Sequence, residues 1–303
     1  MPKVTVRGMD LNVVRLGAGP PTLVFLHGLI VDNLTSFCYT LAAAAAEHCE
    51  AICYDQRGHG RSDRPSTGYA PKDGADDLAA LLDELHVEGP VYLCGNSYAS
   101  VVQFEFARRY PQRLAGLCII EGHLVRAGWG EQMLDTMDMG FWALYEPDAR
   151  EWLKLHQTRK IRQQVQATEA LVFETSLMAD LRYAPVTDLD QLATLRCPVL
   201  LIYGEYSDIF EVGQLLAATI PTTEMRVVRD CGHSVLQQKT EVARDHLVEW
   251  LLRQKTAAST ASPVAASDGT RAAAGAGIEI GKVSETEGTD VVEAGGAVRW
   301  AAS

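Results

Sequence analysis

The chain has 303 residues, with 39 acidic and 27 basic side chains and therefore a formal net charge of -12. That length fits one large domain with an insertion or two ordinary domains, and either can bury a substantial core. The acidic balance argues against a nucleic-acid partner, because neutralising phosphates requires a basic face and no Lys/Arg cluster is present. No apolar run approaches the roughly 20 residues that span a bilayer.

The first residues lack the apolar stretch of a secretory signal, so we expect a cytoplasmic protein. Seven cysteines are present, an odd number, and none has C-x-x-C spacing. Several lie in apolar stretches, which is typical of small buried side chains in a reducing compartment. We therefore expect neither a disulfide framework nor a metal site.

Short apolar runs rich in β-branched residues alternate with longer helical patterns. The runs predict strands at residues 4–7, 11–16, 22–27, 51–55, 91–94, 114–120, 199–203 and 225–229. The stretches between them predict helices at 35–48, 72–86, 99–110, 211–219 and 239–253. The inner strands are almost continuously apolar, as in a sheet covered by helices on both faces. We therefore expect an α/β protein with a mostly parallel eight-stranded sheet, and a site beyond the carboxyl ends of its strands.

Two segments break this alternation. Residues 121–195 show no convincing strand but several amphipathic stretches with Met and aromatic side chains, which predict a helical cap over the mouth of the site. Residues 256–303 contain 13 alanines and 7 glycines and too few large apolar side chains to offset the entropy of ordering. We predict a disordered, low-complexity tail there, with a docking strand at 277–292 as the alternative. The core then comprises residues 1–120 and 196–255.

The sharpest chemical signal is Cys94-Gly95-Asn96-Ser97-Tyr98-Ala99-Ser100, between a predicted strand and a predicted helix. A serine presented on such a tight turn needs small residues two positions before and after it, and Gly95 and Ala99 meet that need. The helix that follows directs its free N–H groups at charge that develops on a substrate. Ser97 is therefore the candidate nucleophile.

A serine hydroxyl needs a base, and the base needs a carboxylate that orients it. His233, in Cys231-Gly232-His233-Ser234 just after the last predicted strand, is the candidate base. Asp208, in the loop after the preceding strand, is the favoured acid. Two other carboxylates remain open: Glu205, nearer the end of the same strand, and Glu121, at the end of the strand before it.

The order Ser97, Asp208, His233 on a parallel sheet resembles the α/β-hydrolase fold superfamily over residues 1 to about 254. His27-Gly28-Leu29-Ile30 ends the third strand as that superfamily's oxyanion loop does. This implies that the N–H groups of Leu29 and Tyr98 stabilise a tetrahedral oxyanion. The sequence from Asp55 to Asp63 is similar to the family's D-x-R-G-x-G-x-S loop, which implies a structural role. The insertion at 121–195 falls where the family has its cap.

The resemblance implies a cofactor-free serine hydrolase that cleaves an ester or thioester of a medium-sized, largely apolar small molecule through an acyl-enzyme on Ser97. The Ala-rich composition and the loose tail favour a bacterial source and a role in metabolism. We expect a monomer or a homodimer. Substrate contacts are expected from the oxyanion loop, the end of the sixth strand and the cap: His27, Gly28, His123, Trp129, Met137, Phe141 and Trp142.

Three other functions remain open. The tripeptide Gly95-Asn96-Ser97 is shared with meta-cleavage-product hydrolases, which break a carbon–carbon bond, although Ser234 stands where those usually carry Trp. Acyl transfer to an acceptor other than water would use the same residues. A hydrolase fold that serves as a non-catalytic ligand receptor is the third, but such a protein has no need of an intact Ser/Asp/His set.

Overall fold

The computed structural model describes residues 3–143 and 158–261, apart from the side chains of 138–143, 159–162 and 258–261. Its centre is an eight-stranded sheet in the order β1-β2-β4-β3-β5-β6-β7-β8. The β1–β2 and β2–β4 pairs are antiparallel, and every other pair is parallel. The predicted mostly parallel sheet is thus confirmed. The strands are β1 (Lys3–Val6), β2 (Met9–Leu16), β3 (Thr22–Leu26), β4 (Glu50–Tyr54), β5 (Val91–Asn96), β6 (Leu114–Ile120), β7 (Val199–Gly204) and β8 (Thr223–Val228).

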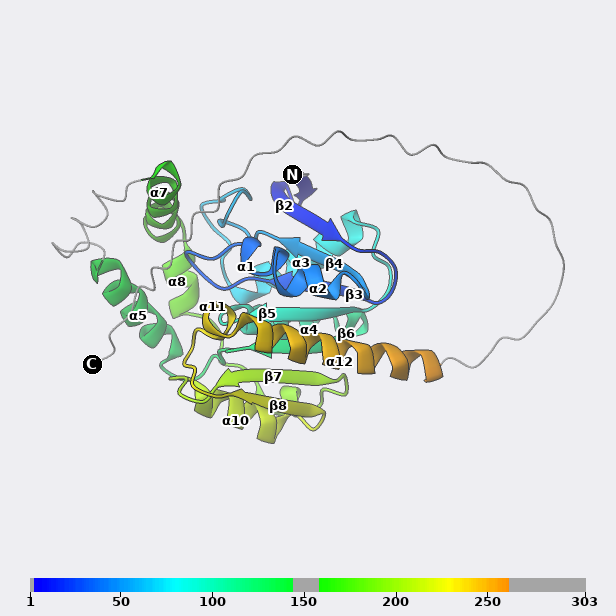
Figure 1. The fold of residues 1–303 in the computed structure, drawn as a ribbon. Helices are drawn as coiled ribbons and strands as arrows, with labels where there is room; N and C mark the ends of the chain where they lie inside the picture. Colours follow the sequence, from blue (N-terminus) through cyan, green and yellow to red (C-terminus); the bar gives the residue numbers. More distant parts are fainter. Residues whose placement is uncertain (1–2, 144–157, 262–303) are drawn as a thin grey trace, which may run out of the picture. The chain divides into compact units, whose positions relative to one another are not determined.

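Helices flank the sheet (Figure 1). Successive side chains of a strand point to opposite faces, so the sheet separates two hydrophobic cores. Val24 and Leu26 of β3 belong to the core that α3 and α4 cover, whereas Leu23 and Phe25 belong to the one that α2 and α12 cover. These helices are α1 (Thr35–Cys38), α2 (Leu41–Ala45), α3 (Pro71–Glu84), α4 (Ala99–Arg109), η1 (Pro111–Arg113), α10 (Phe210–Thr219), α11 (Val235–Gln238) and α12 (Thr240–Ala261).

The segment between β6 and β7 contains helices and no strand among its described residues. It forms α5 (Trp129–Ala143), α7 (Arg159–Phe173), α8 (Leu177–Arg182) and α9 (Leu189–Ala193). Hydrogen bonds join it to the loops that follow β3 and β4. Gln164 Nε2 donates to the Val31 carbonyl at 3.0 Å, and the N–H of Tyr69 donates to Asp180 at 2.8 Å. Since those loops leave the carboxyl ends of the strands, the insertion stands at the edge where the sequence predicts the site.

Two predicted elements differ from the observed ones. Residues 35–48 form the two short helices α1 and α2 rather than one helix. Thr40 separates them with φ -124° and ψ -101°, and its hydroxyl donates to the carbonyl of Ser36 at 3.0 Å, a local bond that competes with helix formation. The last helix continues to Ala261 and so includes the first residues of the predicted tail. The remainder of that prediction, from 262 on, lies outside the described residues.

Within the described part of the chain, no helix has the length and apolar character to cross a membrane.

Candidate active site

Ser97 stands on a tight turn between β5 and α4. Its φ is +56°, in the left-handed region that residues other than glycine rarely adopt. A Cβ at Gly95 would lie 2.5 Å from Oε1 of Gln103 and 3.0 Å from Cβ of Ala99, so only glycine permits this approach of strand and helix. The N–H of Ser97 donates to the carbonyl of Ile120 at 2.9 Å. The turn is therefore held by β6 as well as by its own strand and helix.

His233 follows β8 and contacts this serine. Its Nε2 lies 3.2 Å from Oγ of Ser97, within reach for a base and its nucleophile. Its Nδ1 lies 3.1 Å from Oε2 of Glu121 and 3.7 Å from Oδ1 of Asp208. The contact with Glu121 is short enough for a hydrogen bond, whereas the contact with Asp208 is too long. The imidazole thus bridges Ser97 and Glu121.

The two carboxylates near His233 have different surroundings. Glu121 follows β6 with φ +51° and its side chain is fully buried, whereas the side chain of Asp208 is 78% exposed. Glu121 also accepts hydrogen bonds from the N–H of Gly204 and, at 2.5 Å, from the hydroxyl of Ser207. A carboxylate that accepts three hydrogen bonds in a buried site is held in one orientation, so the geometry favours Glu121.

The third carboxylate that the sequence leaves open, Glu205, is directed elsewhere and accepts from the N–H of Asp230 at 3.3 Å. Sequence patterns do not single out Ser207, which lies beside Asp208 and donates a hydrogen bond to Glu121. Its place in the loop after β7 is the only available signal, because its role depends on a carboxylate that arrives from another strand.

The loop after β3 presents backbone N–H groups. The N–H of Gly28 donates to Oδ2 of Asp32 at 2.6 Å, and that of Ile30, whose φ is +68°, donates to Nε2 of His59 at 3.0 Å. The N–H groups of Leu29 and Tyr98 donate to no group among the described residues. Two free backbone donors, one on this loop and one at the start of α4, are what an oxyanion hole requires.

Two imidazoles brace this loop. Nδ1 of His59 lies 2.8 Å from the carbonyl of Arg57 and carries the proton, which leaves Nε2 as the acceptor for Ile30. Burial lowers the pKa of His59 to about 3, so the ring stays neutral and keeps accepting. Fully buried His27 is arranged in the same way, with Nε2 accepting from the N–H of Gln56 at 2.9 Å. Its ring therefore supports the loop rather than lining open space.

The other residues expected to contact substrate lie after β6 and on α5. The ring centroid of His123 is 5.5 Å from that of the candidate base. Trp129 is 4% exposed, and its indole N–H donates to Nδ1 of His123 at 3.5 Å. Met137 is partly buried against the hydrophobic core. Phe141 and Trp142 belong to α5, but their side chains lie outside the described residues.

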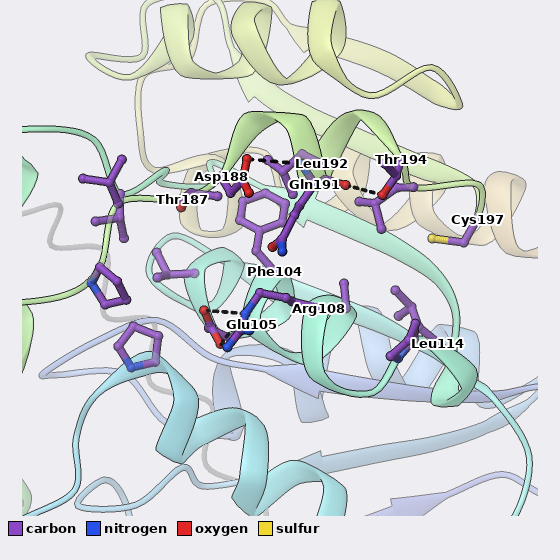
Figure 2. A pocket seen from close by; sticks show the side chains of 18 of the residues that line it. Phe104, Glu105, Arg108, Leu114, Thr187, Asp188, Gln191, Leu192, Thr194 and Cys197 are labelled. Carbon is purple, nitrogen blue, oxygen red and sulfur yellow. Dashed lines mark hydrogen bonds and ion pairs between the residues drawn. The ribbon is translucent and has the colours of Figure 1, made fainter.

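A cavity of about 820 Å³ lies apart from these residues, between α4 and the segment that leads from the insertion to β7 (Figure 2). The Glu105–Arg108 ion pair and Asp188 are among the groups on its walls. Asp188 is already engaged, since it caps α9 by accepting from the N–H of Asp190 at 3.0 Å. None of Ser97, Glu121 and His233 lines this cavity. Among the described residues, no cluster of three His, Cys, Asp or Glu side chains is placed to hold a metal ion.

A family model described as the alpha/beta hydrolase family matches residues 23–245. The 2-(acetamidomethylene)succinate hydrolase of Mesorhizobium japonicum is 35% identical over 119 residues, which span 39% of this chain and 41% of that enzyme. A 2-hydroxy-6-oxononadienedioate/2-hydroxy-6-oxononatrienedioate hydrolase of Paraburkholderia phymatum is 28% identical over 78% of this chain and 88% of that enzyme. A solved esterase from Thermogutta terrifontis has a TM-score of 0.68 at 24% identity, covering 84% of this chain and 98% of that one.

Proposed function

Because the chain belongs to the alpha/beta hydrolase family, we propose that it is a serine hydrolase that cleaves an ester or thioester of a medium-sized, largely apolar small molecule. One observation carries this proposal. Oγ of Ser97, the imidazole of His233 and the carboxylate of Glu121 form a continuous chain, with contacts of 3.2 and 3.1 Å. This is the arrangement that activates a serine for attack on a carbonyl carbon.

In the proposed reaction, Nε2 of His233 takes the proton of Ser97 while the serine oxygen attacks the carbonyl carbon. Glu121 accepts the hydrogen bond from Nδ1 and stabilises the imidazolium ion. The N–H groups of Leu29 and Tyr98 donate to the oxyanion that forms on the substrate. The imidazolium then protonates the leaving alkoxide or thiolate. A water molecule repeats the sequence on the acyl-enzyme and regenerates the serine.

Glu121 takes the acid's role in this proposal, instead of the Asp208 that the sequence favours. Asp208 is exposed, and its carboxylate is 3.7 Å from the imidazole, so solvent screens its charge. Glu121 has no contact with solvent and already accepts from two other donors. Its charge therefore acts on His233 through less water and from a fixed position.

The test of the proposed function is the removal of Ser97. Ser97→Ala should lower kcat for a p-nitrophenyl ester by roughly 10⁴- to 10⁶-fold and abolish covalent labelling by a fluorophosphonate probe. Ser66→Ala is the matched control, because that serine contacts α8 through its backbone carbonyl and should keep both signals. An unchanged rate in Ser97→Ala would exclude this serine as the nucleophile. Failure of a fluorophosphonate to label folded wild-type protein would favour a ligand receptor.

Carbon–carbon bond hydrolysis is the second candidate. The shared Gly95-Asn96-Ser97 tripeptide and the relative named for a 2-hydroxy-6-oxo-dienedioate substrate favour it. Product analysis separates the two functions. Turnover of a 2-hydroxy-6-oxo-dienoate to a carboxylic acid and a dienol, with p-nitrophenyl esters left intact, would replace the esterase proposal with this one.

A further inference from the structure

His123 is fixed to the nucleophile's turn through its backbone. Its N–H donates to the carbonyl of Ser97 at 3.4 Å, and its own carbonyl accepts from the hydroxyl of Ser100 at 2.7 Å. The preceding residue is equally confined, since a Cβ at Gly122 would lie 2.3 Å from Cγ2 of Ile119. The imidazole of His123 therefore extends from a point that is fixed relative to the candidate nucleophile.

The tautomer of His123 follows from its neighbour. The indole N–H of Trp129 donates to Nδ1 at 3.5 Å, and an indole nitrogen can only donate. Nδ1 is therefore the acceptor nitrogen, and in the neutral ring the proton lies on Nε2. Burial and the nearby His233 lower the pKa of His123 to about 3, which keeps the ring neutral. Trp129 is itself buried in the hydrophobic core, so the orientation of its indole is fixed.

The Nε2–H of His123 has no acceptor among the described residues. The side chain is only partly buried, and its ring centroid is 5.5 Å from that of His233. The nearby carboxylate of Glu121 already accepts from Gly204, Ser207 and His233. A donor without a partner among the described residues thus lies beside the residues proposed to carry out the reaction.

Resting on the serine hydrolase function proposed above, we infer that His123 determines specificity by donating a hydrogen bond from Nε2 to a neutral ketone, ether or lactone oxygen close to the scissile carbonyl. A plain hydrocarbon chain would displace water from this donor and leave it without a hydrogen bond. Because an unsatisfied donor costs free energy, such a substrate would bind less well. A carboxylate is disfavoured at the same place, because Glu121 and Asp208 already bring negative charge to this end of the site. The substrate class is therefore an otherwise apolar ester with one neutral acceptor oxygen near its reacting carbonyl.

The experiment compares two esters of equal length, p-nitrophenyl 3-methoxypropanoate and p-nitrophenyl pentanoate. For each ester, kcat/KM is divided by the rate of alkaline hydrolysis of that ester, which corrects for its intrinsic reactivity. The quotient for the methoxypropanoate divided by the quotient for the pentanoate measures the preference for oxygen. His123→Phe, which keeps a flat ring without a donor, should lower this ratio about tenfold, the size expected for one hydrogen bond. His123→Gln retains an N–H donor and should keep most of the preference.

An unchanged ratio in His123→Phe, or an equal fall in both variants, would overturn the inference, because neither result depends on the donor. His86→Asn, on the surface after α3, is the control and should leave rates and ratio unchanged. Fluorophosphonate labelling of Ser97 in each variant separates this outcome from failure of the proposed function. If His123→Phe does not fold, nitrogen-15 chemical shifts of wild-type His123 decide. A proton on Nδ1 overturns the inference and a proton on Nε2 supports it.

Discussion

At the scale of single residues, we expect the two carboxylates beside His233 to differ in how much kcat falls when the charge of each is removed. Glu121→Gln keeps the shape of the side chain but removes the charge that stabilises the imidazolium ion, so we expect kcat to fall roughly 10³- to 10⁴-fold. Asp208→Asn should lower kcat less than about tenfold, because this exposed charge is screened. Steady-state hydrolysis of a p-nitrophenyl ester by both variants measures the difference. The reverse order would return the role of the acid to Asp208.

A second residue-scale prediction concerns His59. Its pKa is about 3 in the folded chain because burial disfavours the charged ring, against about 6.5 in an unfolded chain. Between these values the unfolded chain binds a proton that the folded chain does not, so the free energy of unfolding decreases as pH falls through this window. From pH 7 to pH 5 this one imidazole should remove about 2 kcal/mol.

His59→Gln tests this prediction, since it keeps an acceptor for the N–H of Ile30 but cannot titrate. The free energy of urea unfolding, measured at pH 7 and pH 5, should differ by about 2 kcal/mol less in the variant than in the wild type. An equal difference in both proteins would show that His59 is protonated in the folded chain at pH 5.

The sequence could predict which residues form the candidate site better than which of them form hydrogen bonds with one another. It predicts Ser97 and His233 from local patterns, because a tight strand–turn–helix and a glycine before a loop histidine are readable along the chain. It leaves three carboxylates open, because which of them reaches the imidazole depends on burial and side-chain length. The bond from Ile30 to His59 joins the loops after two neighbouring strands, so no local pattern indicates it.

At the scale of elements, the approach of β5 and α4 gives a further prediction. Gly95→Ala places a methyl group 2.5 Å from the amide of Gln103, which donates to the carbonyls of Leu93 and Cys118 at 3.1 Å each and so cannot move freely. We expect a loss of about 1–3 kcal/mol in the free energy of unfolding, together with reduced kcat. Gly89→Ala is the control, because nothing lies within 4 Å of its Cβ. Equal stability of the two variants would contradict the close packing described for this turn.

The elements themselves could largely be predicted, for a physical reason. Buried parallel strands need apolar side chains on both faces, so β3 and β7 appear in the sequence as short apolar runs. The break between α1 and α2 was not predictable from composition, because residues 41–46 are good helix formers and the interruption depends on the backbone at Thr40. The contacts between the helical insertion and the rest of the chain include single hydrogen bonds, such as that from Tyr69 to Asp180, which have no sequence pattern.

At the scale of the whole molecule, every residue proposed to act in catalysis lies in the compact unit Met1–Ser262. We therefore expect a chain that ends after Ser262 to retain kcat/KM for a p-nitrophenyl ester within about twofold. We also expect its thermal unfolding midpoint to stay close to that of the full chain. Both proteins can be compared by steady-state kinetics and calorimetry. A loss of more than about tenfold in kcat/KM would show that residues 263–303 contribute to the reaction.

Three residues with left-handed backbone angles, Ile30, Ser97 and Glu121, occur in the loops that form the candidate site. Glycine adopts these angles without steric cost, whereas each non-glycine residue there costs of the order of 1–3 kcal/mol. The chain thus gives up stability at the positions where it places its proposed nucleophile, its acid and its oxyanion loop. At Ser97, selection of variants for heat resistance alone would favour glycine and erode turnover, whereas Glu121 regains part of this cost through the three hydrogen bonds that its buried carboxylate accepts. An engineered version of this protein should gain its stability elsewhere in the sheet and helices.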